Sequence, residues 1–180
     1  TRASGIFCYN IQTDKMWYSG TAYADNTEHW GIHFKSGSDP DVLDSAAAIS
    51  ERKWKIDQNG NTSQEGSLTL NDHYTLEVSS SALTSTTQTA IATFPVASFS
   101  TAKIIVQAKD TVTDEIHASE LLIIHDGTTA ISTEYAMIYS GAAPLATYDV
   151  DISGSNVRVL ATSASTNNTT YKTTKNLIKV

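Results

Sequence analysis

The sequence is poor in cysteine, because Cys8 is the only one among 180 residues. A chain with a single cysteine forms no internal disulfide, so a disulfide-stabilised scaffold is excluded. Cys8 lies in the stretch GIFCYN, among apolar residues and without a neighbouring His or basic residue to activate its thiol. This setting predicts a small, buried hydrophobic side chain rather than a nucleophile.

Long apolar runs and basic stripes are also missing. No run of 18 apolar residues is present, and no charged segment is followed by an apolar leader, so neither a membrane span nor a secretory signal is expected. The chain has 12 basic and 19 acidic residues, a formal net charge of -7. Without a basic surface to contact phosphates, nucleic acid is not an expected partner.

Motifs of the common enzyme and metal classes are absent. The sequence has no GxSxG, Walker or dinucleotide-binding glycine pattern, and no carboxylate pair placed as in a glycosidase. His29 and His33 are four residues apart but flank Gly31, and GSDPDVLD lacks the glycine and distal glutamate of a calcium loop. We therefore expect no enzymatic activity, no cofactor and no metal site. The one helix expected covers Val42–Ser50.

Hydroxyl side chains are abundant instead, with 25 Thr and 21 Ser. Thr favours strands and Ser favours turns, so this composition indicates an all-β protein. The polar stretch Ser79–Thr89 resembles a linker, which predicts a small β-rich segment at residues 1–86 and a second domain at residues 87–180.

The second half contains about seven short strand-like runs, several with apolar residues at every second position. In TAKIIVQAK, Ala102, Ile104, Val106 and Ala108 share one face. ISTEYAMIY has apolar residues on both faces, which predicts a central strand. Together the runs predict an antiparallel β-sandwich. They are Gln88–Phe94, Thr101–Lys109, Ile116–Ile124, Ala130–Tyr139, Leu145–Ile152, Asn156–Ala161 and Thr170–Ile178.

His125 and Asp126 are adjacent in SELLIIHDGTTAIS, a pattern that could mark either a catalytic pair or a turn. Asp126-Gly127 between two strand-like runs is a strong hairpin signal. Side chains of adjacent strand residues point to opposite faces, which separates an imidazole from a neighbouring carboxylate. We therefore predict a turn.

The first half is more irregular, with short strands expected at Gly5–Ile11 and Lys15–Tyr18. It contains seven aromatic residues within 28 positions. Three interpretations remain open: a small core, a contact between subunits, or a face on which sugars stack. The candidate residues for the last two are Trp17, Tyr18, Tyr23, Trp30 and Phe34.

Two stretches resemble structural proteins of tailed bacteriophages. From Thr87 to Ile178, the motifs STAKIIVQ, SELLIIHDGTTA, TEYAMIYSG and ATYDVDISGSNVRVL resemble a module of virion proteins from T4-like and cyanobacterial phages. The first half is similar, more loosely, to tail-fibre segments through GIFCYN and the following YSGTAY.

This resemblance implies a structural subunit of the virion in a tail fibre, baseplate, neck or collar. Its expected partners are copies of itself, as a homotrimer, and other virion proteins. The alternative is a receptor- or glycan-binding module at a fibre tip that contacts a host surface glycan, and a polysaccharide depolymerase is a further alternative.

Overall fold

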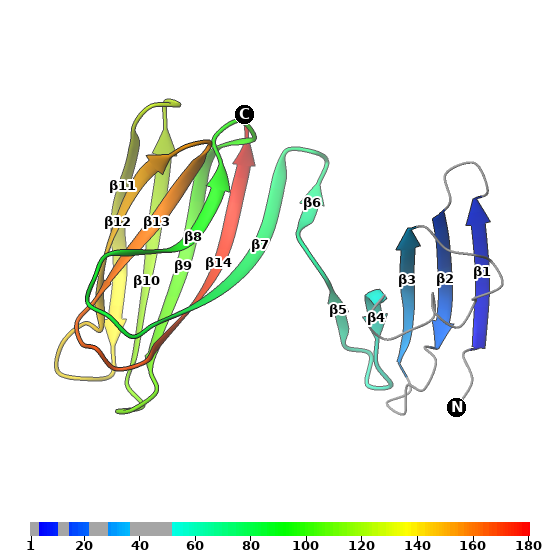
Figure 1. Cartoon of the computed structure of the whole chain (residues 1–180), viewed down its shortest axis with the longest axis horizontal. Helices are drawn as coiled ribbons and strands as arrows, with labels where there is room; N and C mark the ends of the chain where they lie inside the picture. The colour runs from blue at the N-terminus through cyan, green and yellow to red at the C-terminus, as the bar shows by residue number, and fades with distance from the viewer. Residues whose placement is uncertain (1–3, 11–14, 22–28, 37–51) are drawn as a thin grey trace. The chain divides into compact units, whose positions relative to one another are not determined.

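The computed structural model describes residues 4–10, 15–21, 29–36 and 52–180. It divides into two compact units, Thr1–Gly66 and Ser67–Val180. All regular structure in the described residues is β, which confirms the predicted fold class (Figure 1). The expected helix at Val42–Ser50, the GSDPDVLD segment and Tyr23 lie outside the described residues.

The first unit contains a five-stranded antiparallel sheet whose strands follow one another in chain order (Figure 1). Asn59-Gly60 makes the turn between the last two strands, with Gly60 in the left-handed region at φ 83°. Asp57 holds this turn, because its Oδ1 accepts hydrogen bonds from the backbone N–H groups of Asn59 and Asn61, each at 2.9 Å. The strands are β1 (Ser4–Asn10), β2 (Lys15–Thr21), β3 (Trp30–Ser36), β4 (Arg52–Ile56) and β5 (Thr62–Gln64).

The second unit is a β-sandwich. A six-stranded sheet has the order β11-β10-β9-β14-β7-β6, and a three-stranded sheet has the order β12-β13-β8. All seven strands expected in this region are confirmed. The bounds are β6 (Leu68–Leu70), β7 (Tyr74–Leu83), β8 (Thr89–Pro95), β9 (Phe99–Asp110), β10 (Ile116–His125), β11 (Ala130–Tyr139), β12 (Ala146–Ser153), β13 (Asn156–Ser163) and β14 (Thr169–Lys179).

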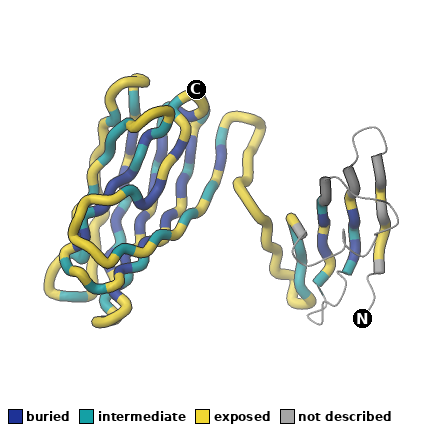
Figure 2. The backbone as a smooth tube through the Cα atoms, viewed as in Figure 1, coloured by how far each residue is buried: buried dark blue, intermediate teal, exposed yellow. Residues whose placement is uncertain are grey.

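Alternating side chains fill the space between the two sheets. Ala102, Ile104, Val106 and Ala108 of β9 are fully buried, as the two-residue period predicts. Figure 2 shows the same alternation of buried and exposed positions along neighbouring strands of the sandwich. The three-stranded sheet adds Phe94, Val157 and Val159 to this core.

Strand β11 differs from the prediction of a central strand. It lies at the edge of the six-stranded sheet, and its apolar residues Ile131 and Ile138 are exposed. Apolar residues on both faces of this strand therefore do not reflect burial on both sides. They leave an apolar outer surface on the sheet.

The sandwich begins earlier in the chain than the sequence suggested. Strand β7 pairs with β14 along ten residues and occupies part of the polar stretch that resembled a linker. Its serines are satisfied by neighbouring strands: Ser79 Oγ lies 2.6 Å from Thr173 Oγ1, and Ser81 Oγ donates to the Ile91 carbonyl at 3.2 Å. The compact unit accordingly starts at Ser67, before β7, rather than at residue 87.

Candidate interaction face

One face of the five-stranded sheet gathers all three tryptophans of the chain. Trp17 of β2 pairs with Phe34 of β3, and Trp30 lies four residues before Phe34, on the same side of that strand. Trp54 of β4 lies opposite Ile32 of β3. We call this surface the tryptophan face, comprising Ile6, Cys8, Trp17, Trp30, Ile32, Phe34 and Trp54.

The aromatic rings of this face contact each other across the strands. The ring centroids of Trp17 and Phe34 are 4.7 Å apart. Trp30 and Trp54 meet edge to face at 5.8 Å and 80°. Trp17 is nevertheless 48% exposed and Trp30 43% exposed. The rings therefore order one another while much of their surface stays open to solvent.

Tyr18 does not belong to the tryptophan face. It is fully buried on the opposite side of β2, with its ring 5.2 Å from that of His33. Its hydroxyl donates to the Thr21 carbonyl at 2.7 Å. A Cβ atom at Gly5 would lie 2.2 Å from the Ser19 carbonyl oxygen and 2.7 Å from the Tyr18 ring, so this packing requires glycine at position 5.

Two further residues differ from the sequence analysis. Cys8, expected to be buried, is exposed, and it lies opposite Trp17 in the pairing of β1 with β2. Trp54 was not among the candidates, and only the pairing of β4 with β3 brings it beside Trp30. Of the five candidates, the tryptophan face therefore unites Trp17, Trp30 and Phe34.

His125 and Asp126 form the predicted turn. His125 Nδ1 accepts the Gly127 N–H at 3.1 Å, so its Nε2 carries the proton and donates to the Phe99 carbonyl at 2.5 Å. Asp126 Oδ1 accepts from the backbone N–H groups of Thr128 and Thr129, both at 2.8 Å. The Thr129 and Thr128 bonds lower the pKa of Asp126 to about 2. Both side chains are thus bound to backbone groups, those of the turn and that of Phe99 in β9, and the predicted turn is confirmed.

A histidine, a serine and a glutamate meet inside the sandwich. Ser119 Oγ donates to Glu134 Oε1 at 2.6 Å and lies 3.1 Å from His117 Nε2. Because the serine has one proton, His117 Nε2 is the donor in the second bond. A hydrolase triad needs the carboxylate on the histidine and a reachable serine, whereas here Glu134 binds the serine and both His117 and Ser119 are buried. The cluster is structural.

Acid is expected to weaken the sandwich through His117. Burial lowers the pKa of His117, opposed by the charge of Glu134, and its ring packs against Tyr139 and Tyr148. The unfolded chain takes up the proton first, so stability falls as the pH drops below about 6.5 toward the lower folded pKa. Urea unfolding at pH 7 and pH 5 should show a smaller loss for His117→Phe than for wild type. His73→Gln, at an exposed histidine, is the control and should lose as much stability between pH 7 and pH 5 as the wild type. An equally large loss for His117→Phe would contradict the role of His117 in acid destabilisation.

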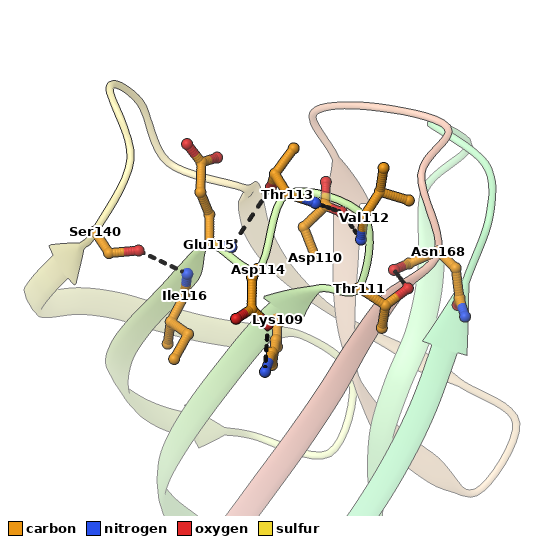
Figure 3. A network of polar contacts seen from close by, with 10 residues as sticks. All are labelled: Lys109, Asp110, Thr111, Val112, Thr113, Asp114, Glu115, Ile116, Ser140 and Asn168. Carbon is orange, nitrogen blue, oxygen red and sulfur yellow. Dashed lines mark hydrogen bonds and ion pairs between the residues drawn. The ribbon is translucent and has the colours of Figure 1, made fainter.

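A polar network secures one end of the sandwich (Figure 3). Asp110 Oδ1 accepts the Val112 N–H at 2.7 Å, and the Asn167 amide donates to its Oδ2 at 2.8 Å. The hydrogen bond from Asn167 is the main cause of the lowered pKa of Asp110.

Further polar contacts join three loops at this end of the sandwich. Lys109 forms an ion pair with Asp114 at 2.6 Å, and Thr111 Oγ1 donates to the Asn168 carbonyl at 2.9 Å. The Ile116 N–H donates to Ser140 Oγ at 2.8 Å. The carboxylates of Asp110 and Asp114 therefore stabilise the turn between β9 and β10.

The described residues contain no group of three or more His, Cys, Asp or Glu side chains placed to hold a metal ion. They also contain no helical segment with the length and apolarity that a bilayer crossing requires.

Comparison with known proteins gives structural matches only. No family model and no curated protein matches the sequence. The tailspike protein gp49 of Acinetobacter baumannii bacteriophage Fri1, described as a capsular polysaccharide depolymerase, is 16% identical over 64% of this chain and 21% of its own, with a TM-score of 0.39. The tailspike protein of Acinetobacter phage vB_ApiP_P1 is 17% identical over 81% of this chain and 29% of its own, with a TM-score of 0.36.

Both matches are tail proteins of bacteriophages, the general class that the sequence resemblance indicated. This chain spans less than a third of either tailspike. The prediction of a chain without enzymatic activity is contradicted, since one matched protein is described as a depolymerase, and it is withdrawn. Assignment to a baseplate, neck or collar stays a prediction.

Proposed function

We propose that the chain is a host-attachment module of a bacteriophage tail protein, in which copies associate through the tryptophan face. The observation that carries this proposal is the pair of half-exposed tryptophans on one face of the sheet. Most of the described side chains of this face are apolar, with Ser19 between Ile6 and Ile32 and Thr21 opposite Trp30. The aliphatic side chains of Ile6 and Ile32 are exposed on the same face as the rings. Exposed aromatic rings beside isoleucines suit a protein partner, because the centres of protein interfaces are enriched in aromatic and apolar side chains.

The free energy available from covering this face is substantial. Covering the open half of one tryptophan removes on the order of 100 Å² from water, which stabilises the complex by about 2.5 kcal/mol. Covering two tryptophans and their aliphatic neighbours therefore contributes a free energy of association several times larger than the thermal energy. A small sheet with one open apolar face is also marginally stable by itself, so association stabilises the unit as well.

The proposed partner outside the virion is a polysaccharide of the host surface. The loose resemblance of the first half to tail-fibre segments, and of the second half to a module of phage virion proteins, supports a role in attachment. Cleavage of that polysaccharide is testable in the same samples, because release of reducing ends from capsular polysaccharide would extend the role from attachment to depolymerisation.

Trp17→Ser is expected to reduce the assembled mass while leaving the fold intact. The substitution removes the most exposed aromatic ring described on the face, whereas the backbone pairing of residue 17 with Cys8 and Phe34 remains. Multi-angle light scattering at micromolar concentration measures the mass, with a trimer predicted for the wild type, and circular dichroism checks the fold. Val112→Ser removes an exposed apolar side chain from the sandwich and serves as the control.

Two results would contradict self-association through this face: a monomeric wild-type chain, or an unchanged mass for Trp17→Ser. If the variant keeps its mass but loses binding to a polysaccharide, the tryptophan face is a sugar-stacking surface instead.

A further inference from the structure

The outer face of the six-stranded sheet has a groove of about 620 Å³ that crosses β7, β14 and β9. Two rows of side chains form it. Thr174 of β14 pairs with Val78 on one side and Ile105 on the other, which gives a largely apolar row. Two residues earlier in β14, Lys172 pairs with Ser80 and Gln107, which gives a polar row. An apolar floor therefore runs beside a line of hydrogen-bonding groups.

Beyond Ile105, the same row passes through the charged side chain of Glu120 and ends at an aromatic ring at the edge of the sheet. Ile105 pairs with Glu120 of β10, and Glu120 pairs with Tyr135 of β11. Lys103 Nζ lies 5.9 Å from the centre of the Tyr135 ring and 3.0 Å from Glu120 Oε2. With strands about 4.8 Å apart, this row extends about 19 Å from β7 to β11. That length accommodates several sugar rings in sequence.

The charge of this face is opposite to that of the whole chain. On the outer positions of the paired strands lie Lys103, Lys109 and Lys172, with Glu120 as the one acidic residue, although the chain carries a net charge of -7. Glu120 binds Lys103, and Asp114 binds Lys109. Lys172 is exposed in the groove and has no ion pair with any described residue. It is therefore available to an anionic ligand.

These features distinguish a saccharide from a protein as the occupant. Protein interfaces are depleted of lysine in their centres, whereas Lys172 lies in the middle of this groove. Saccharides combine apolar ring faces with hydroxyl groups, which matches an apolar row beside serine, glutamine and lysine. A carboxylate on the sugar would satisfy the lysine through a charge-assisted hydrogen bond.

We propose that this groove binds an acidic polysaccharide, with Lys172 contacting a uronate carboxylate. Gln107 and Ser80 bind sugar hydroxyls, and Val78 and Ile105 support the apolar ring faces. The inference extends the proposed attachment function by naming the ligand class, and it assigns the contact to the sandwich rather than to the tryptophan face.

The test is isothermal titration of the full chain with tetragalacturonate, using a neutral maltotetraose as the comparison sugar. Tetragalacturonate should bind and maltotetraose should not. Lys172→Gln should weaken binding about tenfold and reduce its salt dependence, because one charge-assisted contact is lost. Gln107→Ala should weaken binding less, and Lys53→Gln, on the other unit, should have no effect.

Equal binding of the two sugars, or unchanged binding by both Lys172→Gln and Gln107→Ala, would overturn the proposal. A short ligand avoids avidity, so the affinity per chain does not depend on assembly. If the Trp17→Ser variant no longer assembles but still binds tetragalacturonate, the result would support a binding site in the groove that is independent of the tryptophan face. A wild-type chain that stays monomeric would contradict only the self-association part of the proposed function.

Discussion

A fragment of residues Ser67–Val180 is expected to fold by itself, whereas a fragment that starts at Thr87 is expected to stay largely unfolded. The shorter fragment lacks β7, which pairs with β14 over ten residues in the six-stranded sheet. Its loss turns β14 from an inner strand into an edge strand. It also removes the hydrogen bonds from Tyr74 to Asn176, at 2.5 Å, and between Ser79 and Thr173, at 2.6 Å.

Both fragments can be compared by circular dichroism and by urea unfolding. The longer one should unfold cooperatively, with a midpoint close to that of the same unit in the full chain. The shorter one should show no cooperative transition. A cooperative transition in the shorter fragment would contradict the structural role of β7, and a disordered longer fragment would mean that the two units depend on each other for folding.

Glu77→Gln is expected to destabilise the sandwich by about 2 kcal/mol, because it leaves a buried lysine without its counter-charge. Lys175 Nζ lies 2.8 Å from Glu77 Oε2, and the lysine side chain is only 7% exposed. Its remaining contact is a hydrogen bond to the Thr93 carbonyl at 3.0 Å. The partial exposure of Glu77 keeps the expected loss below that of a fully buried pair.

The matched control is the surface pair of Lys53 and Glu65, which has a similar separation of 3.0 Å but two exposed side chains. Glu65→Gln should change the free energy of unfolding of its own unit, Thr1–Gly66, by less than about 0.5 kcal/mol. The double variant Glu77→Leu with Lys175→Met should recover most of the stability, since both charges are then absent. An equal effect of Glu77→Gln and Glu65→Gln would contradict the importance of burial.

Most of the sandwich could be predicted from local sequence. The two-residue period of β9 and the Asp126-Gly127 turn are contained in short stretches, so their structure follows from the residues themselves. Strand β7 was missed because its serines resemble a linker, and only the partner strands supply the hydrogen bonds that make a serine-rich strand stable. The edge position of β11 is likewise a property of the sheet order.

The candidate site was predicted in part for the same reason. The aromatic content indicated a surface of interest, and strand alternation places Trp30 and Phe34 on one side of β3. The same alternation separates Tyr18 from Trp17, a distinction that the count of aromatic residues ignored. Trp54 reaches the face only through a strand pairing across more than 20 residues of chain. The outer groove combines β7 with β14, which the sequence placed in different domains.

The irregular backbone of β11 bears on how such a module avoids uncontrolled polymerisation. Ala136 has φ 54°, at the position where β11 has one residue more than β10 between their paired positions. A regular edge strand with exposed isoleucines would be a template for a strand of another molecule. The bulge interrupts the regular spacing of N–H and C=O groups along this edge, so we expect a second β11 to align along it less readily. We expect this irregularity to lower the tendency of neighbouring copies to join strand to strand into amyloid-like ribbons.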